Sequence, residues 1–387
     1  MHGSWDMADL RAHASGLSPR EAARLLIYRP RYGTETLFTG IHRLTERATA
    51  TFGGALHLHY PEPALHRSPR ELADGADVLA ALAATIDHAL DVRPLDPAFT
   101  VFHLTGGFDS GTIATRAPQR WPGQIDTAAL VVIGAGRERQ LRRRKKMLAQ
   151  VPFSGRDLLV DCAARPPLHS ICARVSGQLI SPYEEPLFAP FAHLTGMIAE
   201  HGARTLVTGL GGDEMVALSP EESAAVAAAN AHITEDAVAP PAVVNAITLL
   251  SLETTAPPLL RAGTWPVHPF TDPAMIALGE QLPIYRREFK NLQRRHLAAL
   301  GLDDDVTNPV ERESFVWLVE SSLKTNGIPL INQMLAHGSP LIEAGLVDPD
   351  GLRATAAEVE SQPYDEEFHA KLLQVIDLHL ATQAFRS

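Results

Sequence analysis

The sequence is poor in cysteine and lacks any long apolar run. Two cysteines, Cys162 and Cys172, occur in 387 residues, and their spacing matches no zinc-ligand pattern. Such usage is typical of a reduced compartment and argues against a disulfide scaffold. No segment approaches the roughly 18 consecutive apolar residues of a membrane helix, and the first residues carry no apolar signal core. We therefore expect a cytoplasmic protein with no membrane partner.

A surplus of positive charge is also absent. The formal net charge is −11, from 34 Lys and Arg against 45 Asp and Glu, so general nucleic-acid binding is not expected. One basic block, from Arg137 to Lys146, departs from this balance. A solvated helix face is its simpler interpretation. The alternatives are a dock for an acidic peptide or carrier, or a lid on ATP phosphates.

Several common site signatures are missing. The phosphate loop with Gly, four residues and Gly-Lys-Ser/Thr does not occur, and neither does the glycine-flanked serine of the hydrolase elbow. The 17 histidines show no His-Glu-x-x-His spacing. Gly134 and Gly136 follow an expected strand, but Arg139 occupies the third glycine position of a dinucleotide fingerprint.

The strongest feature that is present is a strand ending in two glycines, VFHLTGGFDSGT from Val101 to Thr112. Glycines at a strand end leave backbone N–H groups free to face an anion, and the next helix adds the partial positive charge of its N-terminus. Thr105 and Ser110 supply hydroxyl donors, and Asp109 can hold the magnesium that accompanies polyphosphate. The stretch therefore predicts a pyrophosphate cradle.

A second glycine-rich loop, TGLGGDE, follows another expected strand and ends in Asp213 and Glu214. Its glycines allow the backbone to approach a ligand closely. In a parallel sheet both loops would lie beyond the carboxyl ends of their strands, where such folds bind ligands. We therefore expect Asp109 and Asp213 to share one magnesium ion.

Expected strands and helices alternate through the first half of the chain. Strands are expected at 99–104, 127–133, 157–160 and 205–208, and helices at 70–90, 110–115 before Pro118, 137–150 and 187–201. This alternation predicts an α/β fold with a parallel sheet flanked by helices, and beyond about residue 220 a largely α-helical C-terminal half. Residues 1–65 form a small N-terminal part, with a helix capped by Ser18, a capping box closed by Glu21, and short strands within 36–60 around a turn at 52–54.

The two loops resemble the pyrophosphate loop and the second loop of the asparagine-synthetase superfamily, which includes asparagine synthetases, β-lactam synthetases and lasso-peptide cyclases. The similarity covers roughly residues 66–330. It includes Glu185-Pro-Leu and Arg204-Thr-Leu-Val-Thr-Gly before the second loop, a Pro-Phe-Thr-Asp segment within 267–273, and a Lys-x-x-x-Arg helix from Lys290 to Arg294. It implies that residues 66–387 form an ATP-dependent ligase domain with a PP-loop ATP pyrophosphatase (adenine nucleotide alpha hydrolase-like) sheet.

The resemblance also implies a reaction and its residues. ATP, held with Mg²⁺, adenylates a carboxylate and pyrophosphate departs, after which an amine displaces AMP; both substrates would be small molecules or peptides. The implied metal ligands are Asp109 and Asp213, and the implied catalytic residues are these two with Lys290 and Arg312. The implied nucleotide-binding residues are Leu104, Thr105, Gly106, Gly107, Asp109, Ser110, Val131, Ile133, Gly209, Gly211 and Gly212, with Val131 to Ile133 flanking adenine.

Three positions depart from the family pattern. His2 stands where glutamine-hydrolysing members carry a cysteine, and residues 36–60 resemble only the end of a glutaminase-like domain, so we expect no glutamine hydrolysis. Leu210 stands where asparagine synthetases have Glu and β-lactam synthetases have Tyr; leucine cannot accept a proton, which leaves the general base unassigned. Arg312, ahead of Phe315, stands where a lysine is usual, and its other interpretation is a plain helix-surface arginine.

These patterns favour an ATP-dependent, AMP-forming amide ligase of natural-product biosynthesis that does not hydrolyse glutamine. One alternative is a lasso-peptide-type macrolactam cyclase acting on a precursor peptide. Another is a non-catalytic nucleotide-binding partner subunit, which Leu210 and the short N-terminal part would suit. The presence of Asp109, Ser110 and Asp213 argues against that last interpretation, because a purely structural loop has little use for them.

Overall fold

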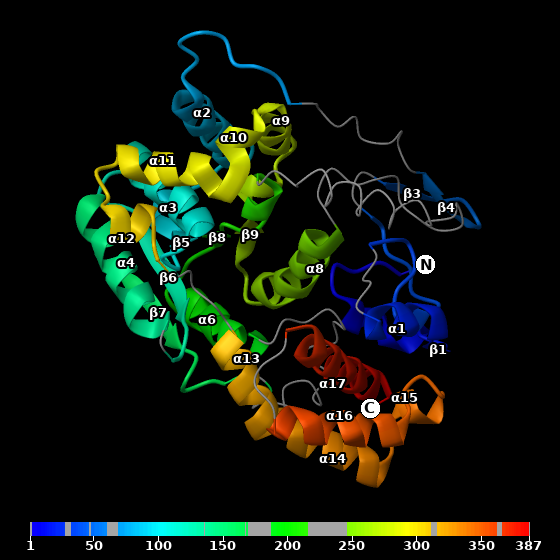
Figure 1. Cartoon of the computed structure of the whole chain (residues 1–387). Helices are drawn as coiled ribbons and strands as arrows, with labels where there is room; N and C mark the ends of the chain where they lie inside the picture. Colours follow the sequence, from blue (N-terminus) through cyan, green and yellow to red (C-terminus); the bar gives the residue numbers. More distant parts are fainter. Residues whose placement is uncertain are drawn as a thin grey trace.

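A five-stranded parallel sheet lies at the centre of the molecule (Figure 1). The computed structural model describes residues 2–27, 32–45, 48–59, 69–134, 136–166, 168, 187–215, 246–310, 316–361 and 366–386. The strands are β5 (Thr100–His103), β6 (Asp126–Val131), β7 (Asp157–Asp161), β8 (Thr205–Val207) and β9 (Trp265–Val267), in the order β7-β6-β5-β8-β9. All neighbouring pairs are parallel.

The order of the strands creates one special position. The chain runs outward from β5 through β6 to β7 and then returns to the other side of β5 to form β8 and β9. The direction of winding therefore reverses between β5 and β8, and open α/β sheets bind ligands beyond the carboxyl ends of the strands at such a reversal. Both predicted loops follow these two strands.

Helices cover both faces of the sheet. Side chains alternate along each strand, so Val101 and Leu206 face one layer while Phe102 and Val207 face the other. The Phe102 side packs against α2 (Val78–Asp91), α3 (Phe108–Arg120), α9 (Pro273–Gln281) and α11 (Asn291–Ala299). The Val101 side packs against α6 (Phe188–Glu200), α8 (Ala246–Arg261) and α13 (Val316–Ser322). The predicted α/β class with a parallel sheet flanked by helices is confirmed.

Some predicted boundaries were wrong. The helix expected from residue 70 begins at Val78, because Gly75 takes a positive φ of 74° and Asp77 caps the helix by accepting a bond from the Ala80 N–H. Helix α3 begins earlier than expected, and Pro118 lies inside its last turn instead of ending it. Strand β9 was not predicted, since it is three residues long and contains Pro266, which a strand at the edge of a sheet tolerates.

Short elements connect the strands and helices. They are η2 (Pro97–Phe99), η3 (Gly212–Met215), η4 (Pro269–Thr271), α10 (Ile284–Arg287), η5 (Glu288–Lys290) and α12 (Asp304–Thr307). The C-terminal helices that follow α13 are η6 (Leu323–Gly327), α14 (Ile328–His337), α15 (Pro340–Glu343), α16 (Pro349–Ser361) and α17 (Glu366–Arg386), so the expected helical C-terminal half is confirmed. No helix in the described residues combines the length and the apolar character that crossing a bilayer requires.

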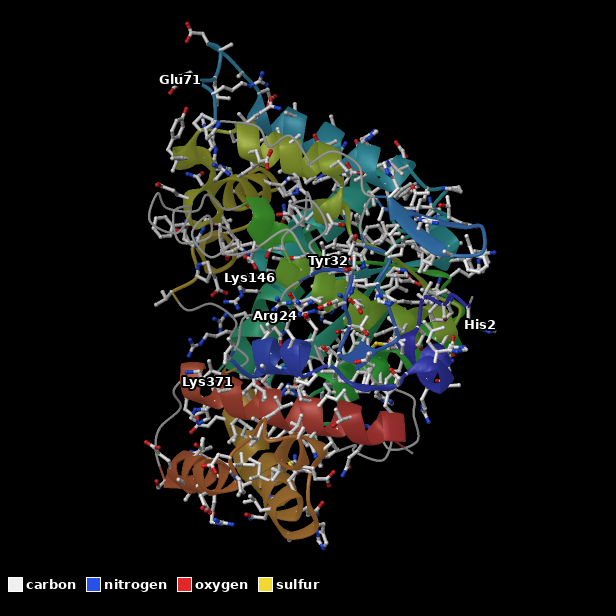
Figure 2. All side chains as sticks on the ribbon, turned by 90° about the vertical axis from the view of Figure 1, so that its right-hand side faces the viewer. His2, Arg24, Tyr32, Glu71, Lys146 and Lys371 are labelled. Carbon is white, nitrogen blue, oxygen red and sulfur yellow. The ribbon has the colours of Figure 1, made fainter. Side chains whose placement is uncertain are left out.

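The N-terminal part packs on the C-terminal helix. It contains η1 (Met7–His13), β1 (Gly16–Leu17), α1 (Pro19–Leu26), β2 (Phe38–Thr39) and a hairpin of β3 (Thr49–Phe52) and β4 (Leu56–His59). Ala22 and Leu25 of α1 share an apolar cluster with Leu378 and Ala381 of α17. In Figure 2, α1, which carries Arg24, lies against α17, which carries Lys371. The domain boundary expected near residue 65 falls outside the described residues and stays a prediction.

Details of the N-terminal elements also differ in part from expectation. Ser18 caps α1 by accepting a bond from the Glu21 N–H, as predicted. The Ser18 N–H, however, donates to the Leu37 carbonyl, so the reciprocal half of the capping box is not formed. The hairpin turn expected at 52–54 lies one residue later, at 53–55, because Phe52 still pairs with Leu56. The strands of the hairpin are largely exposed, because the period-two pattern there does not face a core.

The basic helix α4 (Gly136–Gln150) directs several of its charges into the protein. Arg144 is 2% exposed; its guanidinium binds both carboxylate oxygens of Asp157, at 2.7 and 2.9 Å, and donates to the Leu104 carbonyl. Arg142 and Lys146 form ion pairs with Asp305, at 2.8 and 3.0 Å. These contacts join α4 to β5, β7 and α12. Docking of an acidic peptide or carrier at this block stays a prediction.

Replacing Arg144 by Ala should lower the free energy of unfolding by about 3 kcal/mol, because a buried ion pair would lose one partner. That value is near the low end for such pairs, since Asp157 is partly exposed and keeps its bond from the Thr127 hydroxyl. Denaturant titration would measure the change. Arg142→Ala, which breaks an exposed pair on the same helix, is the matched control; an equal loss in both variants would contradict the assignment.

Candidate active site

The two glycine-rich loops touch each other at the reversal point of the sheet. Residues Thr100 to Phe102 of β5 pair with Thr205 to Val207 of β8, so the segments after these strands leave the sheet side by side. A Cβ atom at Gly209 would lie 2.6 Å from the carbonyl carbon of Asp109, and one at Gly212 would lie 2.5 Å from the Asp109 Cβ. Only glycine permits this approach.

The first loop is held in a turn by its own hydroxyls. The Thr105 N–H donates to Ser110 Oγ (3.0 Å), the two side-chain hydroxyls lie 2.8 Å apart, and the Gly107 N–H donates to Thr105 Oγ1 (3.2 Å). Gly106 has a φ of 97°, which favours glycine. Helix α3 then begins at Phe108, and the first N–H groups of a helix have no intrahelical acceptor. The loop therefore has the backbone form of an anion cradle.

Lys290 joins the two predicted metal ligands. Its ammonium forms an ion pair with Asp109 Oδ2 and another with Asp213 Oδ1, at 2.8 Å. Burial raises the pKa of Asp109, and the nearby ammonium only partly offsets this effect. Burial disfavours the charge of Lys290, but the two carboxylates outweigh it and raise the pKa of Lys290. The protonated Lys290 thus lies between the two acidic side chains.

The backbone that carries Lys290 is strained. Phe289 and Lys290 both take left-handed conformations, with φ of 52° and 58°, and non-glycine residues in this region cost about 1–3 kcal/mol each. Lys290 directly precedes α11, whose Arg294 donates to the carbonyls of Phe289 and Thr307. These two bonds hold the strained turn in place and so keep the Lys290 ammonium beside Asp109 and Asp213.

The acidic pair suits magnesium. Asp109 and Asp213 offer hard oxygen donors, and Oδ1 of Asp109 is buried with no hydrogen-bond partner among the described residues. Magnesium in phosphate-transfer sites typically uses one or two carboxylates and completes its shell with phosphate and water oxygens. The described residues contain no group of three or more His, Cys, Asp or Glu side chains placed for a metal. A two-carboxylate site completed by substrate oxygens is therefore the arrangement that fits.

A cavity of 490 Å³ opens over the two loops, and its volume is typical of a small-molecule site. Asp109, Asp213 and Lys290 line it. Apolar side chains of α6 and α8, among them Phe188, Phe191 and Leu259, line it as well. The predicted residues that line the cavity are Thr105, Gly106, Gly107, Asp109, Ser110, Gly209, Asp213 and Lys290.

Other predicted residues lie behind the cavity wall. Leu104 is fully buried in the core, Gly211 packs against Thr271, and Gly212 packs against Asp109. Val131 and Ile133 do not line the cavity; Leu130, one residue earlier on the alternating strand, does. These five positions therefore do not line the cavity, and their contact with a nucleotide stays a prediction. Arg312 and Phe315 lie outside the described residues.

The backbone at the end of β6 is also already bonded. Gln140 of α4 donates from Nε2 to the Leu130 carbonyl (2.9 Å) and accepts the Val132 N–H at Oε1 (2.8 Å). The Val131 carbonyl accepts the Cys162 N–H (3.0 Å). These bonds occupy much of the backbone that was expected to flank adenine.

Several cavity residues were missed from the sequence. They are His103, Gln140, Arg143, Phe188, Phe191, Thr208 and His268. Arg143 belongs to the basic block but is only 3% exposed, which composition could not reveal. Thr208 and His268 follow β8 and β9, and recognising β9 as a strand would have placed them together at the carboxyl edge.

Comparisons with known proteins give little beyond this geometry. No family model matches the chain, and no curated protein matches it. Among solved structures, an NH3-dependent NAD synthetase from Campylobacter jejuni subsp. jejuni NCTC 11168, in complex with the nitrate ion, matches with a TM-score of 0.31 and 10% identity over 75% of this chain and 99% of that chain. At that TM-score the match supports no functional argument.

Gly209→Ala should separate the two loops and lower the free energy of unfolding by roughly 1–3 kcal/mol, because the added methyl group meets backbone instead of a flexible side chain. Thermal or denaturant unfolding would measure this. Gly196→Ala in α6, where a Cβ meets nothing within 4 Å, is the matched control and should raise stability by up to about 1 kcal/mol. Equal stability of the two variants would show that the loops are not in contact.

Proposed function

We propose that the chain is an ATP-dependent, AMP-forming amide ligase that adenylates a carboxylate and joins it to an amine. The main support is the convergence of an anion cradle, two carboxylates and a lysine at the reversal point of a parallel sheet. The resemblance of both loops to the asparagine-synthetase superfamily supports the same reaction.

Different residues of the site would have different roles in the first half-reaction. A substrate carboxylate oxygen attacks the α-phosphorus of ATP, the bond to the β-phosphate oxygen breaks, and pyrophosphate departs. The N–H groups of the cradle and the hydroxyls of Thr105 and Ser110 would bind the departing pyrophosphate. Magnesium held by Asp109 and Asp213 would supply positive charge against its oxygens. Lys290, already between the two carboxylates, would add a further cation where negative charge develops.

An ATP–pyrophosphate exchange assay with a panel of carboxylic acids and peptides tests this proposal. Label should pass from pyrophosphate into ATP only when a suitable acid is present, because exchange requires a reversible adenylate. Binding of ATP without exchange for any acid or peptide would remove the ligase assignment and favour a non-catalytic subunit. Adding ammonia, amino acids or a precursor peptide to an exchange-competent mixture and identifying the product by mass spectrometry would then separate an intermolecular ligase from a macrolactam cyclase.

Asp109→Asn should reduce the exchange rate by roughly 10²–10³-fold, since a group that stabilises charge in the transition state is lost. Stability should not fall, because burial already disfavours the ionised carboxyl at this position. Exchange kinetics and the melting temperature would be measured together. Asp350→Asn, on the exposed start of α16, is the control that should keep full activity. If Asp109→Asn were as active as this control, the metal-ligand role of Asp109 would be contradicted.

A further inference from the structure

We propose that His268 is the general base that takes the proton from the attacking amine, and that Thr208 positions its ring. This inference rests on the proposed ligase function and concerns the second half-reaction. Both residues line the cavity together with Leu210, the loop residue that cannot accept a proton. His268 thus supplies a proton acceptor in the same cavity wall.

The register of the sheet brings His268 and Thr208 together. Val207 of β8 pairs with Val267 of β9, and the Thr208 N–H donates to the Val267 carbonyl at 2.9 Å. The next residue on each strand therefore leaves the sheet at the same level. There, His268 Nδ1 lies 2.7 Å from Thr208 Oγ1.

The hydrogen bonds of Thr208 connect this pair to the second loop. Its hydroxyl oxygen accepts the Leu210 N–H at 3.2 Å and can also accept a proton donated by His268 Nδ1. With Nδ1 carrying the hydrogen, Nε2 keeps the lone pair that a base needs. Thr208 then fixes the orientation of the ring and accommodates the tautomer with hydrogen on Nδ1, while its N–H and the Leu210 N–H hold the loop in register with the ring.

The other histidine of the cavity, His103, is less suited to accept a proton. Its Nε2 is buried and has no hydrogen-bond partner in the described part of the chain. Burial, reinforced by the nearby guanidinium of Arg144, lowers the pKa of His103 to about 4. A buried cation beside the ring opposes formation of a second positive charge. For His268, burial alone lowers the pKa to about 4, so the ring is neutral at pH 7 and free of that repulsion.

The amine nitrogen attacks the carbonyl carbon of the acyl-adenylate and forms the new C–N bond. His268 Nε2 takes one proton from that nitrogen. The bond from the carbonyl carbon to the phosphate oxygen breaks, AMP leaves with the electron pair, and the imidazolium later releases its proton to water.

The test measures the two half-reactions separately in His268→Asn. Asparagine can still donate a hydrogen bond to Thr208 from its amide nitrogen but has no counterpart of Nε2. Carboxylate-dependent exchange should stay within about twofold of wild type, while amide formation with a basic amine should fall by roughly 10²–10⁴-fold. With hydroxylamine in place of the basic amine, the rate of the variant should fall much less, because the nitrogen of hydroxylamine loses its proton more readily.

The matched control is His379→Asn. His379 also pairs through Nδ1 with a buried hydroxyl, Ser339 Oγ at 2.9 Å, but it lies on α17 away from the cavity. This variant removes an equivalent buried pair and should keep both half-reactions. A parallel loss of amide formation in the control would show that the effect is structural and would overturn the proposal.

Thr208 variants test the positioning role without altering the histidine. Thr208→Ser keeps the hydroxyl and should retain amide formation, whereas Thr208→Val keeps the shape, loses the bond and should lower the rate of the second half-reaction while exchange persists. Equal rates in the Ser and Val variants would exclude a positioning role for the hydroxyl.

The remaining outcomes are distinct. Absence of exchange in the wild-type protein overturns the ligase function itself and, with it, this inference. Exchange with unchanged amide formation in His268→Asn overturns only the role of His268. Loss of amide formation in His103→Asn but not in His268→Asn transfers the base to the other histidine and likewise overturns the assignment.

Discussion

The candidate site depends on one close contact, that between the loops after β5 and β8. Direct pairing of these strands forces the two loops to leave the sheet together, and Gly209 and Gly212 let the second loop rest on the backbone and side chain of Asp109. The same contact places Asp213 where Lys290 can reach both carboxylates. A larger residue at either glycine would move the acidic pair apart, and the cavity would then lose its cation-binding end. The cradle alone could bind an anion; only the contact makes it a site with paired carboxylates.

The elements around this contact hold charge in an environment that disfavours it. Burial raises the pKa of Asp109 although the Lys290 ammonium lies beside it. Lys290 is kept there by a strained turn that the hydrogen bonds of Arg294 hold in place. Beneath the cradle, Arg144 binds the Leu104 carbonyl and Asp157, so it connects the end of β5 to β7. The basic helix, which by composition suggested a surface for partners, therefore directs two of its arginines, Arg143 and Arg144, into the interior. Preorganised charge of this kind costs stability and is typical of sites that stabilise developing charge.

Local signals in the sequence were sufficient to place four strands and both loops and to bring Asp109 and Asp213 near one another. Lys290 was expected at the site only from the resemblance of its Lys-x-x-x-Arg helix. Features that depend on pairing between distant segments were not accessible in the same way. Strand β9 is three residues long and contains a proline, so no periodicity marks it. The choice of Leu130 over Val131 as a cavity residue depends on which face of β6 turns towards α6, and the burial of Arg144 depends on β7 lying beside β6. Helix starts at Val78 and Phe108 differed because capping by Asp77 and Gly107, not apolar spacing, decides where a helix begins.

Leu210 and His268 line the same cavity and both bear on the second half-reaction. A ligase must remove a proton from its amine, and an aliphatic residue on the second loop cannot do so. The acceptor must then come from another element that reaches the same cavity. Among the described residues, the end of β9 provides this, because its register with β8 fixes an imidazole against Thr208 and next to the Leu210 backbone. In the proposed reaction the proton acceptor therefore lies at the end of the neighbouring strand, while the second loop contributes its glycines and the carboxylate proposed to hold magnesium.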